Sequence, residues 1–282
     1  MTRKIGIGAV ALLLASAPCV SSGQTVLDGA YIKEHTKTKR VVPYVHIREA
    51  DVMWGRRVWR LIDLREKMNH PLYYPVTPTT DRQSLFDVIK QGLITDGSLT
   101  AYDDGLGEGD QFKKPLLINE VKNILEKIDT LQTEDPDTGD FVEVYVPVTI
   151  EAKDVKWYKV KEDWIFDKQR SKIDIRILGI APVAEDKDED GNFRGLKTLF
   201  WLYYPECRYV FANFEVFNRE NDAERRSFED VFWKRQFTST ITKWSNVYDR
   251  AINQYTTGLD ALLEGEKIKE ELFVFEHDLW NF

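Results

Sequence analysis

Residues 141–150 read FVEVYVPVTI, and this stretch shows most plainly what kind of fold to expect. Apolar residues occupy every second position of it, at Val142, Val144, Val146, Val148 and Ile150. A period of two is typical of a β-strand that turns one face toward a core. Pro147 has no N–H to donate to a ladder, so we expect this strand at an edge.

Two more strands are predicted downstream, over KIDIRILGIAPV (172–183) and LKTLFWLYYP (196–205). The segment between them, AEDKDEDGNFRG (184–195), is polar and contains two glycines. Such a segment between two apolar runs is typical of the end of a long hairpin. The middle of the chain therefore predicts a small, mainly antiparallel sheet.

Helical patterns lie before this sheet. Over residues 49–68, apolar residues such as Val52, Trp59 and Ile62 recur at roughly three- and four-residue spacing, which predicts a helix. A second helix is predicted over 82–94, with Leu85, Phe86, Ile89 and Leu93 as its buried stripe. A short strand at about 99–102 and a third helix at about 116–128 follow.

Helical patterns also follow the sheet. Ser227 and Asp230 resemble a capping box at the start of a helix over FEDVFWKRQF (228–237). A later apolar stripe with three- and four-residue steps predicts further helix; its residues are Val247, Ala251, Tyr255, Leu259 and Leu262. We expect Gly258 and Gly265 to break this region into two helices. We find no fixed repeat and no low-complexity linker. The expected fold is thus a single α+β domain over 46–282, with helical N-terminal and C-terminal parts around a small, mainly antiparallel sheet.

The first residues predict a signal peptide over 1–23. Arg3 and Lys4 precede an uncharged apolar run over 5–17, and small residues then lead to a cleavage site before Gln24. An alternative is lipidation at Cys19. Pro18 directly before it makes a poor site for the lipoprotein peptidase.

Residues 24–45 predict a flexible N-terminal arm. They are basic, with few regularly spaced apolar residues, and the basic side chains are Lys33, Lys37, Lys39 and Arg40. Such an arm is suited to the acidic face of a neighbouring copy. A merely disordered terminus explains the same composition.

Charge excludes two classes of partner. The chain has 39 Lys and Arg against 47 Asp and Glu, and loss of Arg3 and Lys4 makes it more acidic still. Broad binding to nucleic acid or to anionic lipid needs clustered positive charge. Cys207 is the one cysteine after residue 23, so no internal disulfide framework is expected. We expect a thiol packed among the neighbouring aromatic residues; pairing with another chain is the alternative.

Two loops resemble ion or phosphate sites. Asp186, Asp188 and Asp190 match the first half of a calcium loop, but Lys197 stands where a bidentate Glu is needed. We expect a solvated acidic hairpin tip there. The glycine-rich GLGEG (105–109) is flanked by acidic residues that would repel an anion.

The sequence EHD at 276–278 is the one place that resembles a catalytic group. Glu276, His277 and Asp278 are adjacent residues of an expected extended segment, so their side chains would diverge. No nucleophile motif accompanies them. We therefore expect a hydrogen-bonded structural His277, and no catalytic, cofactor-binding or metal-binding residue. The last stretch, LFVFEHDLWNF (272–282), is apolar enough to be docked or at an interface.

Several long aromatic strings resemble the GldN/PorN family of gliding-motility and type IX secretion proteins of Bacteroidetes. They are ADVMWGRRVWRLIDLREKMNHPLYYP (50–75), RQSLFDVI (82–89), LFWLYYPECRYVFANFEVFN (199–218), SFEDVFWKRQFTSTITKWSNVYDR (227–250) and FVFEHDLW (273–280). The resemblance covers nearly the whole chain after residue 50.

The resemblance implies a periplasmic protein at the inner face of the outer membrane. It implies a PorK/GldK-like lipoprotein partner, copies of the pair in a large ring, and contact with the periplasmic part of a PorM/GldM-like inner-membrane motor subunit. It implies no catalytic residue and no cofactor. The competing interpretation is a periplasmic enzyme or ligand-binding protein with a pocket lined by the aromatic residues of 201–209.

Overall fold

The computed structural model describes residues 40–79, 82–105, 109–134, 141–187, 193–221 and 223–279, with the side chains of 127–148 left out. The predicted signal peptide and most of the predicted arm lie outside these residues. All the described residues belong to one compact unit, Lys37–Phe282.

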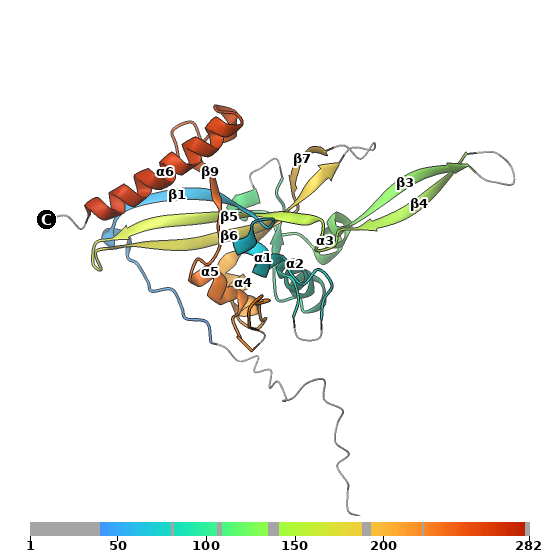
Figure 1. Cartoon of the computed structure of the whole chain (residues 1–282), viewed down its shortest axis with the longest axis horizontal. Coiled ribbons are helices and arrows are strands. Elements are labelled where there is room, and N and C mark those ends of the chain that lie inside the picture. The colour runs from blue at the N-terminus through green and yellow to red at the C-terminus, as the bar shows by residue number, and fades with distance from the viewer. Residues whose placement is uncertain are drawn as a thin grey trace, which may run out of the picture. The chain divides into compact units, whose positions relative to one another are not determined.

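The fold is α+β and is built on a seven-stranded sheet in which every strand pair is antiparallel (Figure 1). The strand order is β2-β8-β6-β5-β1-β9, and β7 pairs with β6. The bounds are β1 (Val52–Asp63), β2 (Ala101–Tyr102), β5 (Val155–Asp167), β6 (Lys172–Lys187), β7 (Phe193–Thr198), β8 (Trp201–Tyr203) and β9 (Thr240–Trp244).

A separate hairpin is formed by β3 (Glu126–Glu134) and β4 (Phe141–Thr149). It confirms the strand predicted at 141–150. Pro147 lies opposite Ile128, and β4 has β3 as its one partner among the described strands, so the predicted edge position is also confirmed. The strand β3 was not predicted: the third helix, α3 (Ile118–Leu125), ends three residues early and the chain turns directly into β3.

The helices are mostly short. Besides α3 they are α1 (His70–Tyr73), α2 (Leu85–Lys90), α4 (Tyr204–Phe211), α5 (Phe228–Trp233) and α6 (Leu259–Asp278). The helix α2 continues as one π-helical turn over Gln91–Thr95. The second predicted helix, at 82–94, is confirmed by α2 and its π turn. The predicted capping box is confirmed at α5, where the Asp230 N–H donates to Ser227 Oγ at 3.2 Å and the Ser227 N–H donates to Asp230 Oδ2 at 3.1 Å.

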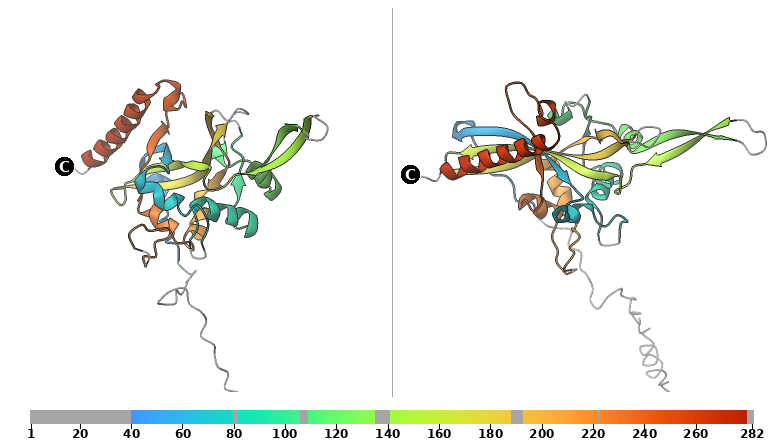
Figure 2. Two further views of the ribbon diagram at one scale, coloured as in Figure 1. Left: turned by 45° about the vertical axis from the view of Figure 1, so that its right-hand side comes forward. Right: turned by 45° about the horizontal axis from the view of Figure 1, so that its top comes forward.

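Two apolar clusters stabilise the sheet along the same two strands. The larger cluster takes Ile62 from β1 and Tyr158 and Val160 from β5, and the helices α1, α2, α4 and α5 pack into it. The smaller cluster takes Val58 from β1 and Trp164 from β5, and α6 packs into it together with β9. Figures 1 and 2 show α6 beside β1 and β9.

The predicted helix over 49–68 is wrong, because these residues form a 3₁₀ turn (Glu49–Asp51) and then β1. Apolar residues four apart, such as Val58 and Ile62, share a face in a helix and also in a strand. Arg60 lies between them at an inner position, and this polar residue interrupts the alternation. Arg60 is buried on the inner face, where its guanidinium donates to Ser239 Oγ at 2.7 Å.

The strand β5 was missed altogether. It is paired along both edges, with β1 and β6. Residues of both its faces are also buried, and this blurs its period of two. Lys161 and Glu162 are among these buried residues. Downstream, the predicted strand 196–205 is corrected to β7, β8 and the first turn of α4, in which Pro205 occupies an early helix position where no N–H is needed.

The predicted helical stripe is wrong for Val247, Ala251 and Tyr255, whereas Leu259 and Leu262 do lie in a helix. After β9 comes an exposed loop with Val247 and Tyr248, and a 3₁₀ turn (Ile252–Gln254) then precedes α6, which begins at Leu259. Gly258, with φ of 58°, does mark a break. Gly265 does not, because it lies inside α6. The C-terminal part is therefore a strand, a loop and one long helix.

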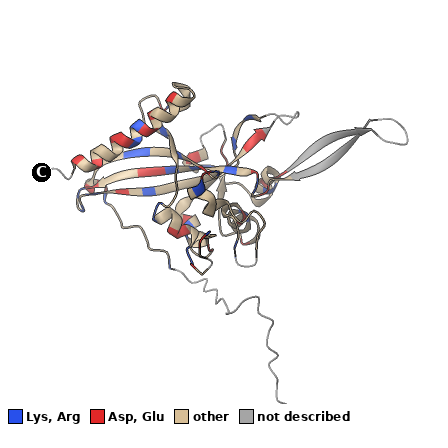
Figure 3. Ribbon diagram, in the orientation of Figure 1, with Lys and Arg blue, Asp and Glu red and all other residues tan. Residues whose placement is uncertain are grey.

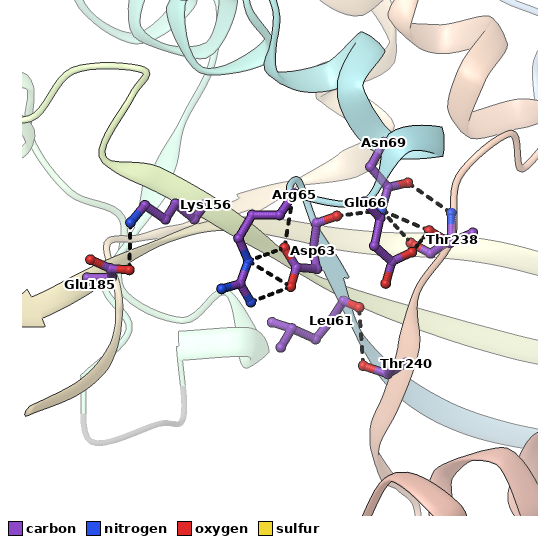
Figure 4. A network of polar contacts seen from close by, with 9 residues as sticks. All are labelled: Leu61, Asp63, Arg65, Glu66, Asn69, Lys156, Glu185, Thr238 and Thr240. Atoms are coloured by element: carbon purple, nitrogen blue, oxygen red, sulfur yellow. Dashed lines mark hydrogen bonds and ion pairs between the residues drawn. The ribbon is translucent and has the colours of Figure 1, made fainter. Parts of the chain in front are cut away.

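A buried asparagine ties the end of β1 to the start of β9 (Figure 4). Asn69 Nδ2 donates to the backbone oxygens of Asp63 at 2.7 Å and Thr238 at 3.0 Å, and the Thr238 N–H donates to Asn69 Oδ1 at 2.9 Å. Glu66 accepts from the Thr238 hydroxyl. These bonds satisfy backbone groups that water does not reach, and they place β9, and with it α6, at the edge of the sheet.

Candidate functional site

The helix α6 is held on the sheet by its inner face. Gly265, Ile268 and Leu272 are buried, and the Phe275 ring packs at a tilt against Trp54 of β1 with ring centroids 4.6 Å apart. Gly265 permits the close approach, because a Cβ atom there would lie 2.9 Å from the carbonyl oxygen of Ile241 on β9. The helix therefore has a fixed orientation, and its other side faces outward.

The outer face of α6 is apolar at both ends. Near the start of the helix Leu259 is 70% exposed and Leu263 59%, and near its end Phe273 is 66% exposed. Leu262 and Val274 are exposed beside them. Glu266 and Glu270 lie between the two groups, and acidic residues run along the helix (Figure 3). We use "outer face" for these residues: Leu259, Leu262, Leu263, Glu266, Glu270, Phe273 and Val274.

The other candidate site is a cradle that holds the end of the N-terminal arm. The Tyr44 ring stacks on Trp233 of α5 at 5.5 Å between centroids. The guanidinium of Arg208, from α4, lies 4.3 Å from the Tyr44 ring, and that of Arg176, from β6, lies 5.2 Å from it. Arg208 also donates to the Val42 carbonyl at 2.7 Å, and Arg176 donates to the Val45 carbonyl. The cradle therefore binds both side chain and backbone of residues 42–45.

A buried ion pair organises this cradle. Arg208 Nη2 lies 2.8 Å from Glu229 Oε1, and the two residues are 3% and 5% exposed. The charges cancel in a place where a single charge would be costly. Burial raises the pKa of Tyr44, although Arg208 and Arg176 act in the opposite direction. Tyr44 thus stays a neutral anchor with its ring between cations and an indole. Whether the rest of the arm is flexible stays a prediction.

An open cavity of about 560 Å³ lies on the sheet face that carries Trp59 and Lys161. Tyr203 is the one member of the predicted aromatic set 201–209 among its lining residues, which also include Phe112 and Asp110. Lys161 Nζ donates to the Asp110 carbonyl at 2.6 Å and lies 3.2 Å from its carboxylate. Burial lowers the pKa of Lys161, and Asp110 opposes that shift. Asp110 therefore holds the Lys161 amine in a fixed position at the wall of the cavity.

The EHD group lies in α6 and not in an extended segment. Glu276, His277 and Asp278 are all exposed, so the expectation of a hydrogen-bonded His277 near the core is wrong. Helical residues in sequence project 100° apart, which keeps these three side chains from converging. Trp280 and Phe282, expected to dock the terminus, lie outside the described residues.

The loop candidates are covered only in part. Asp186 is in β6 and Lys197 is in β7, whereas Asp188 and Asp190 lie outside the described residues. Of GLGEG, Gly105 and Gly109 are described, and beside them Asp103 pairs with Lys114 at 2.7 Å. Within the described ranges, no group of three His, Cys, Asp or Glu side chains has a metal-binding arrangement.

Cys207 lies in α4 within the larger apolar cluster and is 1% exposed. Burial raises the pKa of its thiol, with a smaller contribution from Glu206 in the same direction. The packed thiol that the neighbouring aromatic residues predicted is confirmed, since the side chain is enclosed by apolar residues. A protonated, enclosed thiol is a poor partner for another chain.

Sequence patterns did not reveal the cradle. Its residues come from four separate segments, at positions 44, 176, 208 and 229–233, and no local spacing joins them. The one available signal was an excess of aromatic and arginine residues, which suits anchored contacts of this type. The outer face of α6 was partly anticipated, because residues 272–282 were expected to be docked or at an interface.

Comparison with known proteins finds one family. The sequence model described as "Gliding motility associated protein GldN" matches residues 47–281. None of the curated proteins compared with the chain matches it. Among the described helices, none has the length and apolar character needed to cross a membrane.

Proposed function

The chain belongs to the GldN family of gliding-motility and type IX secretion proteins, and from this membership we propose that it is a non-enzymatic structural component of a periplasmic ring. In this proposal it assembles with an outer-membrane lipoprotein of the PorK/GldK type and with copies of itself. The observation that carries the proposal is the match over residues 47–281, which includes all but a few of the described residues.

Exposed apolar surface supports a role in assembly. The outer face of α6 exposes five large apolar residues on one element, and Met53, Tyr209 and Tyr248 are more than half exposed elsewhere. Exposed apolar residues gathered on one element are a mark of interaction sites. Partner binding would cover this surface and stabilise the folded chain by mass action.

The proposed location is the periplasm, at the inner face of the outer membrane. The signal-peptide pattern of residues 1–23 supports export, and the acidic composition argues against direct binding to anionic lipid. The lipoprotein partner would supply the membrane attachment. From that position the ring would meet the periplasmic part of a PorM/GldM-like motor subunit.

The test is purification of an affinity-tagged chain from membranes in mild detergent. We expect a lipoprotein to co-elute, ring-shaped particles by electron microscopy, and a mature N-terminus at Gln24 by mass spectrometry. The isolated chain should melt at a lower temperature than the chain with its lipoprotein. The proposal would be overturned by a monomeric chain in the soluble fraction whose melting temperature does not change when the lipoprotein is added.

A second candidate function is binding of a small ligand in the cavity beside Lys161 and Tyr203. Its size, about 560 Å³, falls in the usual range for ligand pockets, and it offers aromatic rings with a cation. Native mass spectrometry of the chain purified from its own cells tests this. A retained small molecule that is lost in Lys161→Met would favour the ligand-binding function over the purely structural one.

A further inference from the structure

A groove runs between α6 and the sheet, next to the C-terminal end of α5. Its volume is about 470 Å³, and it is lined on the α6 side by Glu266, Glu270, Phe273 and Glu276. Lys269 also lies on the α6 side. Trp164 and Phe237 line the other side together with Ser239, Arg60 and Arg235. Arg235 is already paired with Glu162 at 2.9 Å, and Arg60 donates to Ser239 Oγ at 2.7 Å. Glu266, Glu270 and Phe273 thus belong both to the outer face and to the wall of the groove. An extended segment bound there would contact apolar rings and carboxylates.

The acidic side chains of α6 are only partly neutralised. The helix carries five Glu and two Asp against Lys267 and Lys269. Lys267 lies 3.9 Å from Glu264, and Lys269 lies 3.2 Å from Glu266. Among the described residues, Glu270 and Glu276 take part in no ion pair. A cationic partner would therefore gain from contact with this wall.

The segment before the cradle has the complementary chemistry. Residues 24–40 read QTVLDGAYIKEHTKTKR, with apolar residues up to Ile32 and then Lys33, Lys37, Lys39 and Arg40. The outer face likewise combines apolar side chains with carboxylates. A 17-residue segment reaches up to about 55 Å when extended, more than the roughly 30 Å length of a 20-residue helix.

The described residues that precede β1 lead away from the α6 of their own chain. From the start of β1, residues 40–48 run past Trp233 of α5 to Arg208 of α4, and Figure 1 shows this course leading away from α6. The anchored Tyr44 therefore fixes the point at which the basic segment joins the folded part of the chain. A neighbouring molecule is the more direct recipient.

We propose that the groove and outer face of α6 bind the basic segment 24–40 of a second copy of this chain. The contact is head-to-tail, because the arm of one copy meets the helix of the next. Heterologous contacts of this kind close into rings when the rotation between copies permits. This inference rests on the proposed ring function and deepens it by naming the surfaces through which copies meet.

Cross-linking of the chain that begins at Gln24 tests the contact directly. A photoreactive residue replaces Leu263, and isotopically heavy and light chains are mixed before irradiation. We expect cross-links from position 263 to peptides of 24–40, including heavy–light pairs. Cross-links to the arm only within one chain would show a contact in cis and overturn the proposal, as would the absence of any arm peptide.

Charge reversal gives the second measurement, by sedimentation velocity. Glu266→Lys with Glu270→Lys should weaken self-association at least about tenfold. Mixing that variant with Lys33→Glu/Lys37→Glu chains should restore association between unlike copies. The matched control is Glu220→Lys with Glu224→Lys, the same charge change on an exposed loop, which should leave association as it was. Circular dichroism confirms that each variant is folded.

The two proposals fail in different ways. If the reversed α6 variant still forms rings with the lipoprotein at undiminished affinity, the arm contact is wrong and the ring function stands. If the natural chain never forms a complex, yet position 263 still cross-links to the arm of another copy, the ring function is wrong and the contact stands.

Discussion

The carbonyl oxygen of Ile241 on β9 lies 2.9 Å from the place that a Cβ atom on Gly265 of α6 would take. A real Cβ does not come so close to a backbone oxygen, so only glycine lets the helix rest on the strand. Together with the packing of Ile268, Leu272 and Phe275, this approach sets the orientation of α6 and thereby decides which of its side chains face outward. The outer face described above depends on it.

Gly265→Ala should therefore destabilise the protein. At an unhindered helix position, alanine in place of glycine stabilises by about 0.5–1 kcal/mol. Here the added methyl group must push α6 from β9, and we expect a loss of about 1–3 kcal/mol, measured by urea unfolding. Lys267→Ala, at an exposed position of the same helix, should stay within about 0.5 kcal/mol. A more stable Gly265→Ala protein would show that the helix is not seated as described.

Glu229→Gln should unfold much more easily than an equivalent change at the surface. It leaves Arg208 as a buried cation without its counter-charge, a loss of about 3 kcal/mol or more. The control is Glu266→Gln, whose carboxylate lies 3.2 Å from the exposed Lys269 ammonium, with an expected cost of about 0–1 kcal/mol. Equal losses in the two variants would mean that the cradle pair is hydrated. Faster proteolysis of residues 40–45 should accompany the Glu229 change.

Asn69→Asp tests the link between β1 and β9. The substitution keeps the shape but turns a donor toward the carbonyl oxygens of Asp63 and Thr238 into an acceptor. We expect a loss of more than about 1–3 kcal/mol at pH 7, since repulsion adds to the unsatisfied groups. Protonation of the new carboxyl should recover part of this loss at pH 4. Stability that is the same at both pH values would contradict these hydrogen-bond roles.

Cys207 should make stability fall at alkaline pH. Because burial raises the pKa of this thiol, the folded chain keeps the proton when the unfolded chain releases it. The stabilisation is fully present below about pH 8.5, where a thiol in an unfolded chain ionises, and is lost as the pH rises above that value. The natural chain should lose more stability than Cys207→Ala between pH 8 and 10. If the stabilities of the natural chain and of Cys207→Ala changed in parallel with pH, the Cys207 thiol would not be buried as described.

Because the Cys207 thiol is enclosed, we also expect it to react slowly with thiol reagents in the folded chain. A thiol reagent at pH 8 should modify the folded chain only at the rate of its unfolding, and denaturant should expose the thiol at once. Rapid labelling of the folded chain, or a disulfide-linked dimer on non-reducing gels, would instead support pairing with another chain.

Local sequence patterns were sufficient to predict an element where its own residues show the periodicity or the cap that defines it. The alternation in 141–150 predicts β4, the apolar run 172–183 predicts β6, and Ser227 with Asp230 predicts the start of α5. The alternation follows from the pleat of a single strand, and the cap follows from two residues three apart. None of these predictions requires knowledge of a distant partner.

Only the tertiary structure shows that β1 and β5 are strands, and only it shows the cradle and the outer face of α6. Val58 and Ile62 fit a strand as well as a helix, and pairing with β5, where Arg57 meets Asp163 at 2.7 Å, selects the strand. Likewise Tyr44 and Trp233 form one cradle although 188 residues separate them. The sequence by itself was enough to predict an acidic chain with an α+β fold, and its aromatic segments were enough to indicate the family. Which side chains meet, and which face of α6 stays open, follow from contacts between distant segments, and local spacing carries no information about those contacts.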